Sequence, residues 1–487
     1  MRRFIALTTL AGAVAVNGTA LADGGYYGGA LDARAAGRAG AFVARADDPM
    51  AVHYNPAGLA TIGGTVFMVG NRFSHNGYSY TRASTLDWGN AAGGVAPMVT
   101  FDPVSNEKAA QPLEPLIAIA SNLGLRDFGF ALAAFAAPGA SNLSFPEDGG
   151  QRYMMLKREA IFLNYTASAA WKFRDLFGIG ATLEWIAVPK LDYSLMIDGS
   201  PFAMDAHPVS SPFDMMASTS GADWFTFNAI LGAWVRPVPF LQIGLAGQVI
   251  PTSIETKSTL TVTPVDPSLG EIEITRDGLP ANDVNVILPL PMMARGGVRY
   301  IGLGTHPFDI EVDVEYETWS RVNQFTVDTH GLSAYLLGSD TPLGRIAIAK
   351  HWRDTLAVKL GGDVSVIPGV LALRGGAFHE TAIADPTYSN VDFPGGRMVG
   401  GAAGASYVSG HWEVAVAYQL RHMLGVSVTE PEARVYQQVP ASACQGPGYN
   451  DPTACNPNYL GQPSPAINAG SYTATFHHLS LALLYRM

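Results

Sequence analysis

Charged residues are scarce in this chain. Asp, Glu, Lys and Arg together make up 15% of its 487 residues, against about 25% in an ordinary soluble protein. The 41 acidic side chains outnumber the 30 basic ones and give a net charge of −11, which argues against nucleic acid as a partner because its recognition needs a basic face. Hydrophobic residues reach 48% and glycine contributes 53 residues, so the chain is too apolar for disorder. Length alone would allow two or three soluble domains, but this composition argues against them.

Cysteine is nearly absent as well. Cys444 and Cys455 are the only two, and one pair cannot cross-link a chain of this length. Both fall in a Pro-rich segment, where a local loop disulfide is the expected state in an oxidising compartment. No His or second Cys pair lies near them, so we predict no metal site there, and we expect no cofactor.

Long apolar runs are missing beyond the N-terminus. The uncharged, mostly apolar stretch over residues 128–145 contains two Gly and a Pro, which is poor chemistry for a transmembrane helix. The N-terminus itself has two Arg, an apolar run over residues 4–16 and the small-residue site Ala20-Leu21-Ala22. This pattern predicts a signal peptide over residues 1–22. The alternative, an N-terminal membrane anchor, is disfavoured because the run is short. An exported chain without spanning helices can be an outer-membrane β-barrel.

Alternation with a period of two supports a barrel. In residues 308–317 one face is Phe, Ile, Val, Val and Tyr, and the other is five carboxylates, from Asp309 to Glu317. Five carboxylates in a row cannot face lipid or a dry core, because unpaired buried charge is costly. They need water or counter-charges, which a polar lumen or a plug supplies. Residues 411–420 and 478–487 alternate in the same way.

Fourteen segments have strand character, and an even number suits a bacterial single-chain barrel. Short and long connections alternate between them, as expected for periplasmic turns and extracellular loops. We therefore predict an all-β fold, a transmembrane antiparallel barrel over residues 64–487. The predicted strands are 65–80, 114–121, 127–137, 158–173, 176–198, 222–237, 240–263, 284–301, 307–328, 353–366, 369–380, 397–409, 411–428 and 473–487.

Residues 23–63 do not alternate. They are mostly small residues broken by Gly and Pro, and a compact segment of this length before the first strand can fill the lumen as a hatch. The alternative is a disordered periplasmic tail, which the aromatic and aliphatic content of the segment disfavours. We expect Asn55, Pro56, Ala57 and Gly58 to form a corner of the hatch, because Pro fixes the backbone and Asn tolerates tight turns.

These segments resemble a known family. The run Gly37-Arg-Ala-Gly-Ala-Phe42, then Asp47-Asp48-Pro49, then Asn55-Pro56-Ala57-Gly58-Leu59 resembles the hatch of the FadL/TodX outer-membrane transporters. Stretches at 289–300, 313–320, 352–361 and 373–377 resemble later parts of that family. The resemblance implies a fourteen-stranded barrel, a hatch, and passive transport of long-chain fatty acids or aromatic hydrocarbons with lateral release beside a kinked strand. We expect a monomer surrounded by outer-membrane lipid and lipopolysaccharide.

Candidate ligand contacts are apolar or cationic. The apolar candidates are Phe135, Met154, Met155, Phe202, Met204, Phe213 and Met215; the alternative is that they only pack loop against loop. Lys190, Lys350 and Arg353 lie where the resemblance places contacts to a fatty-acid carboxylate. The alternative is that they pair with lumen carboxylates such as Asp313 or Glu315.

Enzyme signatures are missing. The chain has no H-E-x-x-H, no G-x-S-x-G and no Walker loop, so we predict a transporter with no catalytic residues. The alternatives are an outer-membrane barrel enzyme of the lipase or esterase kind, and a structural or adhesin barrel.

Overall fold

The computed structural model describes residues 29–87, 95–137, 142–198, 213–336, 339–393, 395–435 and 466–487. Several predictions fall outside these ranges: the signal peptide, the disulfide between Cys444 and Cys455, and the ligand contacts of Phe202 and Met204. They stay predictions.

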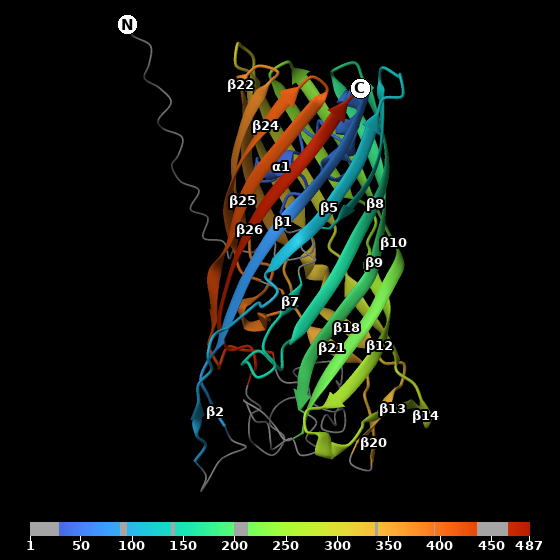
Figure 1. Ribbon diagram of the computed structural model, residues 1–487, viewed down its shortest axis with the longest axis vertical. Coiled ribbons are helices and arrows are strands. Elements are labelled where there is room, and N and C mark those ends of the chain that lie inside the picture. The colour runs from blue at the N-terminus through green and yellow to red at the C-terminus, as the bar shows by residue number, and fades with distance from the viewer. Residues whose placement is uncertain are drawn as a thin grey trace.

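Fourteen antiparallel strand positions close into a ring among the described residues (Figure 1). The ring closes where β1 pairs with β26, from Val66 opposite Arg486 to Arg82 opposite Gly470. This confirms the predicted barrel. In ring order the strands are β1 (Thr65–Arg82), β5 (Ala110–Ser121), β6 (Phe128–Ala136), β8 (Lys157–Phe173), β9 (Phe177–Asp198), β10 (Asp214–Val238), β11 (Leu241–Gln248) with β12 (Ser253–Pro264), β15 (Asp283–Pro289) with β16 (Met293–Gly302), β17 (Phe308–Glu317) with β18 (Gln324–Asp328), β21 (Ile346–Ala349) with β22 (Thr355–Ile367), β23 (Leu371–Glu380), β24 (Met398–Ser409), β25 (Trp412–Val428) and β26 (Gly470–Arg486).

Several strands extend further toward the loop end than the sequence predicts. β10 begins at Asp214 and β5 at Ala110, and β21 lies wholly in a predicted loop. The physical reason is the composition of these extensions. Residues 217–221 of β10 read Ala-Ser-Thr-Ser-Gly, so the alternation of apolar and polar residues that marks a lipid-facing strand is missing there.

Four neighbouring ring positions are interrupted near their middle. The breaks fall at residues 249–252, 290–292, 318–323 and 350–354. Pro251 and Pro291 lie in two of them, and proline interrupts a ladder because it has no N–H to donate. In the other two breaks, Trp319 of η4 (Trp319–Arg321) and Trp352 are buried. The breaks therefore turn two tryptophans into the barrel.

The two ends of the barrel differ. Short turns and the C-terminus lie at the top of Figure 1, and longer connections lie at the bottom. The longer connections hold short elements: β2 (Thr85–Leu86), β3 (Met98–Val99), β4 (Val104–Ser105), β7 (Leu143–Ser144), η3 (Pro267–Leu269), β13 (Glu273–Arg276), β14 (Leu279–Pro280), β19 (Ser333–Leu336), β20 (Ser339–Pro342) and η5 (Pro386–Tyr388). Among the described residues, no helix is both long and apolar enough to cross a membrane.

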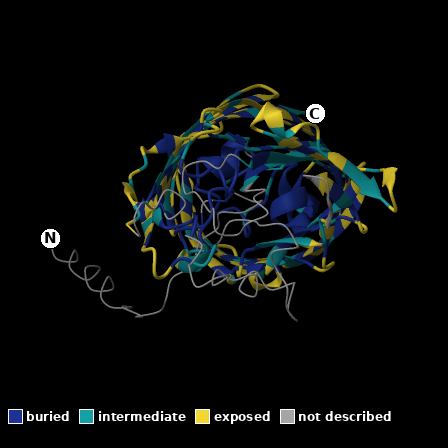
Figure 2. Ribbon diagram, turned by 90° about the horizontal axis from the view of Figure 1, so that it is seen from below, coloured by how far each residue is buried: buried dark blue, intermediate teal, exposed yellow. Residues whose placement is uncertain are grey.

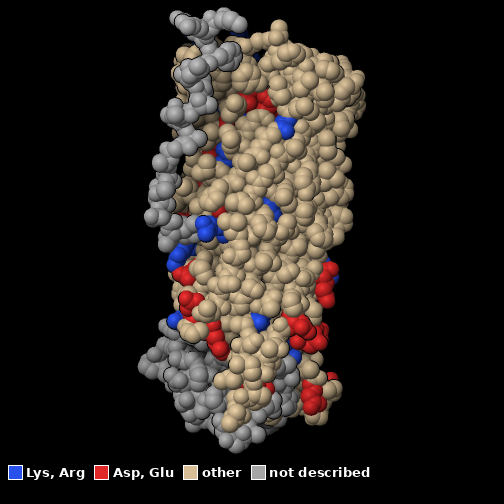
Figure 3. Space-filling view, turned by 90° about the vertical axis from the view of Figure 1, so that its left-hand side faces the viewer, with Lys and Arg blue, Asp and Glu red and all other residues tan. Residues whose placement is uncertain are grey.

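The predicted alternation of β17 is confirmed. Phe308, Ile310, Val312, Val314 and Tyr316 are exposed on the outer face, and the five carboxylates between and after them are buried inside the ring. Figure 3 shows a second division, along the barrel axis, because Asp and Glu gather toward the loop end while most of the remaining wall is uncharged. The outer wall away from the loops is therefore a surface for lipid.

Residues 29–62 lie inside the ring (Figure 2), and we call them the hatch. Their helices are α1 (Ala33–Ala36), α2 (Ala51–Tyr54) and η1 (Pro56–Thr61). Asp32 caps α1 by accepting hydrogen bonds from the N–H groups of Arg34 and Ala35, at 2.8 and 3.1 Å. All three helices are short because Gly37, Pro49 and Pro56 interrupt the helical runs.

The lipid-facing side of β17 gives a first prediction. Val312→Arg places a charge on an outer position that is 45% exposed, near the middle of the strand. We expect it to lower the free energy of unfolding in lipid vesicles by about 2–4 kcal/mol, the cost of a cation at the bilayer midplane. The matched control is Thr261→Arg on the outer face of β12, in the loop half. Urea titrations followed by tryptophan fluorescence measure both, and equal losses would contradict the assigned membrane position.

Candidate functional site

One arginine of the hatch binds three carboxylates of the wall. The guanidinium of Arg38 donates to Asp309 at 2.6 Å, to Asp363 at 2.5 Å and to Glu311 at 2.9 Å. Arg38 is fully buried, so these bonds form away from water, where an unpaired charge is costly. The inner face of β17 therefore receives part of its counter-charge from the hatch. Arg299 and Arg295 of β16 and Lys359 of β22 supply the rest from the wall.

Backbone groups of the hatch complete this attachment. The carboxylate of Asp313 accepts from the N–H groups of Phe42 and Val43, at 2.7 and 2.9 Å. Glu311 accepts from the N–H of Ala44 at 2.6 Å. The carboxylates of β17 thus hold a turn of the hatch as well as its charged side chain.

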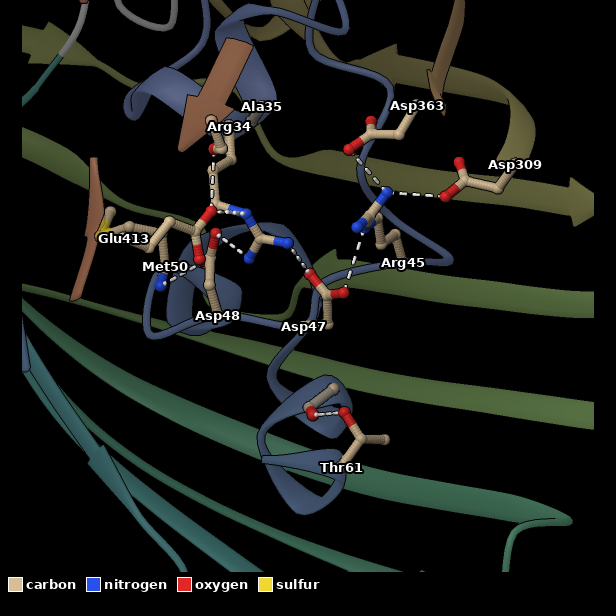
Figure 4. Close-up of polar contacts among 12 residues, drawn as sticks. Arg34, Ala35, Arg45, Asp47, Asp48, Met50, Thr61, Asp309, Asp363 and Glu413 are labelled. Carbon is tan, nitrogen blue, oxygen red and sulfur yellow. Dashed lines mark hydrogen bonds and ion pairs between the residues drawn. The ribbon is translucent and has the colours of Figure 1, made fainter. Parts of the chain in front are cut away.

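Two further arginines extend the network (Figure 4). Arg45 pairs with Asp309 at 2.6 Å and with Asp363 at 3.0 Å. Arg34 pairs with Asp47 and Asp48 of the hatch, at 2.9 and 3.0 Å, and approaches Glu413 of β25 at 3.5 Å. The hatch is therefore bound through ion pairs to strands on more than one side of the lumen.

Inward-facing glycines let the hatch approach the wall closely. A Cβ built on Gly376 would lie 2.4 Å from the carbonyl carbon of Arg38, and one on Gly180 would lie 2.6 Å from the nitrogen of Ala57. Side chains at such positions would push the hatch away, which explains part of the high glycine content. The same close approach occurs at Gly129, Gly232, Gly244 and Gly361.

The predicted hatch corner lies against this glycine surface. Asn55 donates to the carbonyls of Val43 and Ala233, at 2.9 and 3.0 Å, and so joins the hatch to β10. Its side-chain oxygen accepts from the N–H of Ala57 at 3.2 Å and caps η1. Gly58 is required because a Cβ there would lie 2.0 Å from the carbonyl oxygen of Ala46. The four residues form a compact corner with Pro56 at the start of η1.

Toward the loop end the interior becomes apolar. On the turn side, inward positions of β8 and β9 hold Ser168, Thr182 and Glu184, whereas on the loop side they hold Phe162 and Val188. We call one packed cluster of buried apolar side chains in the loop half the apolar chamber. It comprises Ala160, Phe162, Ile186, Val188, Leu191, Met215, Ile254, Leu260, Val262, Val284, Val286, Leu288, Leu290, Trp319, Val322, Phe325, Val327, Leu332, Trp352, Ile383, Ala384 and Phe393.

A lysine lies inside an aromatic cage at the edge of the chamber. Lys350 is buried, pairs with Asp392, and has its ammonium 4.9 Å from the ring centroid of Phe325 and 5.9 Å from that of Trp352. Phe393 forms a third wall, with its ring 5.3 Å from Trp352. The strand interruption at residues 350–354 supplies two of these side chains.

A second cation reaches the same place. The guanidinium of Arg158 lies 4.2 Å from the ring centroid of Phe393 and donates to the backbone carbonyl of Asp392 at 2.5 Å. Cations over aromatic faces are stabilised most when they are desolvated. The cage therefore combines apolar walls with two hydrogen-bond donors of positive charge.

The predicted apolar contacts are distributed over three places. Met215 belongs to the apolar chamber. Phe135 packs on the hatch, with its ring 6.0 Å from that of His53. Met154 and Met155 are buried in a separate cluster nearer the loops, and Phe213 is half-buried. The structure does not bring these residues together, and their ligand roles stay predictions.

The three predicted cations are separate too. Lys190 pairs with Glu159 at 2.6 Å and lies opposite exposed Ile161 in the register of β9 with β8, so it is on the outer face. Arg353 is exposed and pairs with Asp385. Burial opposes ionisation of Asp385, but hydrogen bonds from Thr387 and the charge of Arg353 lower the pKa of this carboxyl. Of the three, only Lys350 lies at the edge of the apolar chamber, and none pairs with Asp313 or Glu315 in the described contacts.

Sequence reasoning missed Arg38, Arg158, Asp392 and the glycine surface. The glycines carried a signal, because they occupy inward positions of segments whose alternation was recognised. Asp392 and Arg158 carried none, since they meet across the lumen. Among the described residues, no three His, Cys, Asp or Glu side chains are arranged to hold a metal ion.

Adjacent glycines on β23 allow a matched test of the hatch contact. Gly376→Ala places a Cβ 2.4 Å from the backbone of Arg38, whereas Gly375→Ala meets nothing nearer than 4.0 Å. We expect Gly376→Ala to destabilise the barrel by about 1–3 kcal/mol through overpacking and to raise ion conductance in planar bilayers. Gly375→Ala should match the parent protein, and an equal conductance of the two variants would contradict the close contact.

Removing the charge of Arg38 gives a second test. Arg38→Met leaves Asp309, Glu311 and Asp363 without their shared partner, and breaking a buried ion pair costs about 3–5 kcal/mol. Arg353→Met breaks an exposed pair with Asp385 and should cost no more than about 1 kcal/mol. Urea unfolding in vesicles measures both losses. Similar values for the two variants would show that the hatch network does not stabilise the barrel.

Comparisons with known proteins agree with this architecture. Residues 13–444 match the family model described as "Outer membrane protein transport protein (OMPP1/FadL/TodX)". A FadL homologue from Pseudomonas aeruginosa has a similar structure, with a TM-score of 0.72, 16% identity, and coverage of 95% of this chain and 99% of that one. The toluene transporter TodX of P. putida gives a TM-score of 0.60 at 12% identity, covering 95% of this chain and 99% of its own.

A third solved structure, the toluene transporter TbuX of Ralstonia pickettii, gives a TM-score of 0.57 at 14% identity, covering 94% of this chain and 98% of its own. Comparison with curated protein sequences gives no match. The structural likenesses agree on the fold, and the family model covers most of the chain. The chain therefore belongs to the OMPP1/FadL/TodX family of outer-membrane transport proteins, and is a hydrophobic-compound transporter of the outer membrane.

Proposed function

We propose that this transporter takes up hydrophobic molecules that end in an acidic group, the class of long-chain fatty acids, by passive diffusion. The observation that carries this choice is Lys350 in its aromatic cage, at the edge of the apolar chamber. An apolar interior alone suits any hydrocarbon. The ammonium of Lys350 is buried with its partner Asp392. An acidic ligand could share this ammonium, whereas a hydrocarbon ligand gains nothing from it.

The chamber supplies the affinity and the cage supplies the selectivity. Burial of an acyl chain contributes about 0.8 kcal/mol for each methylene, so binding needs no chemical step. A carboxylate at the cage would accept charge-assisted hydrogen bonds from the ammonium of Lys350 and the guanidinium of Arg158. Lys190 and Arg353 lie outside the cage and form no part of this binding site, so a ligand role for them stays a prediction.

Release requires the hatch to change its position or shape. The corner formed by Asn55, Pro56, Ala57 and Gly58 is the proposed gating element, because it joins the hatch to β10 and lies against the glycines of β9 and β10. A ligand that binds one hatch arrangement better than the other shifts the population between them.

The proposed lateral exit lies beside β6. This strand has nine residues, between the twelve of β5 and the seventeen of β8. Near the loop end of β6, Phe135 packs against His53 of the hatch. A movement of α2 would therefore change the packing at the loop end of this strand.

Ligand binding by purified protein in detergent tests the substrate class. The double variant Lys350→Met/Asp392→Asn removes the ion pair without leaving a lone buried charge. We expect it to weaken palmitate binding by about tenfold or more, since a hydrogen bond to a charged group contributes about 1.5–3 kcal/mol. Binding of hexadecanol, which has the same chain and no charge, should change little.

Arg353→Met is the control variant, and it should bind palmitate as the parent protein does. Equal loss of palmitate and hexadecanol in the double variant would show that the cage contributes only packing, and preference for toluene over palmitate would favour the aromatic-hydrocarbon alternative. Ester turnover, or binding of neither ligand, would favour the enzyme or adhesin alternatives.

A further inference from the structure

The outer face of the wall changes from apolar to polar along β26 and β8. On β26, the exposed side chains near the turn end are Leu479, Leu481 and Leu483. Toward the loops, the exposed side chain is that of Thr473. On β8 the outward side chains change from Tyr165 to Glu159 in the same direction. This change marks the level at which the lipid head groups of the outer leaflet meet the wall.

A cluster of lysines lies at this level, which we call the lysine cluster. Lys108, Lys157 and Lys190 all place their ammonium groups on Glu159, and Lys190 also contacts Asp192 at 3.2 Å. The lysine side chains stay 49%, 42% and 41% exposed. Three positive charges meet two negative ones, so the cluster keeps one positive charge in excess, with further N–H donors available.

These lysines face the lipid side of the wall. Lys157 and Glu159 alternate along β8 with buried Arg158 and Ala160, which face the lumen. Lys190 lies directly opposite Ile161, which is 46% exposed. Directly opposed residues of an antiparallel pair share one face of the sheet, so all three ammonium groups lie outside the barrel.

An apolar hollow lies on the same outer face, nearer the turn end. Its volume is about 550 Å³. Ala134 and Ala167 leave space between larger neighbours, among them Leu132, Tyr165 and Trp185. We call it the outer hollow, and it runs over the outer faces of β1, β5, β6, β8 and β9.

The spacing of the two features matches a lipid in one leaflet. Glu159 and Tyr165 are on the same strand, and at about 3.3 Å per residue they lie roughly 20 Å apart. A strand tilt of about 40° reduces this separation to about 15 Å along the membrane normal. That is half of the roughly 30 Å hydrocarbon core. An acyl chain in the outer hollow would therefore place its head group near the lysine cluster.

We propose that the lysine cluster and the outer hollow bind one phosphorylated, acylated lipid of the outer leaflet, the lipid A part of lipopolysaccharide. The phosphate accepts hydrogen bonds from the three ammonium groups, and an acyl chain fills the hollow. Charge complementarity selects this occupant, because a lipid without phosphate would leave the excess positive charge unpaired at the head-group level. The site is separate from the lumen and does not depend on which molecule is transported.

Native mass spectrometry of the full chain in detergent tests the site with lipid A and with lipid A stripped of its phosphates. The triple variant Lys108→Gln/Lys157→Gln/Lys190→Gln should weaken lipid A binding by about tenfold and leave the stripped lipid little changed. Ala167→Trp fills the outer hollow and should weaken both lipids. Heat-modifiable migration in gels confirms that each variant is folded.

Two controls match these changes. Lys257→Gln removes an outer-wall lysine elsewhere, on β12, and Ala169→Trp places the same ring one outward position from the hollow; both should bind lipid A as the parent does. Millimolar inorganic phosphate should not displace the lipid. Full displacement by phosphate together with no effect of Ala167→Trp would reduce the site to an anion contact and overturn the proposal. Equal binding by the triple variant and its control would also overturn it.

Discussion

The structure depends on a row of carboxylates that lie away from lipid and cannot remain without partners. Asp309, Glu311 and Asp313 lie on the inner face of β17. Their partners include the guanidinium of Arg38 and backbone N–H groups of the hatch, beside Arg299 of the wall. Because neither side can be buried alone without a large desolvation cost, the wall and the hatch require each other. The ion pairs therefore place the hatch in one orientation, and the glycine surface allows it to sit close to the wall.

A barrel closed in this way has an interior of two kinds. The turn half is polar and occupied by the hatch, and the loop half is apolar and contains one caged lysine. The strand interruptions separate the two halves and aim Trp319 and Trp352 inward. The outer faces of the same strands thus meet two solvents, lipid toward the turn end and water with head groups toward the loop end. Their inner faces change from polar to apolar in the same direction.

Much of the fold could be predicted from the sequence. Period-two alternation marked each ring position, and the carboxylates of residues 308–317 indicated a wet or plugged lumen. The strand ends toward the loops could not be placed, because those extensions lie beyond the lipid and lose the alternation. For the site, Lys350 was found by resemblance, whereas Asp392 and Arg158 were not. They are 234 residues apart and meet only when the ring closes.

The sequence by itself determined the class of the molecule: an exported chain, poor in charge, with alternating strands and a non-alternating segment before them. Local periodicity suffices for this, since the side chains of a strand face opposite sides at every second residue. Only the tertiary structure decided which cation meets which carboxylate, and that Lys190 lies outside the barrel while Lys350 lies inside. These choices depend on register and closure, which bring residues from distant strands to one point in space.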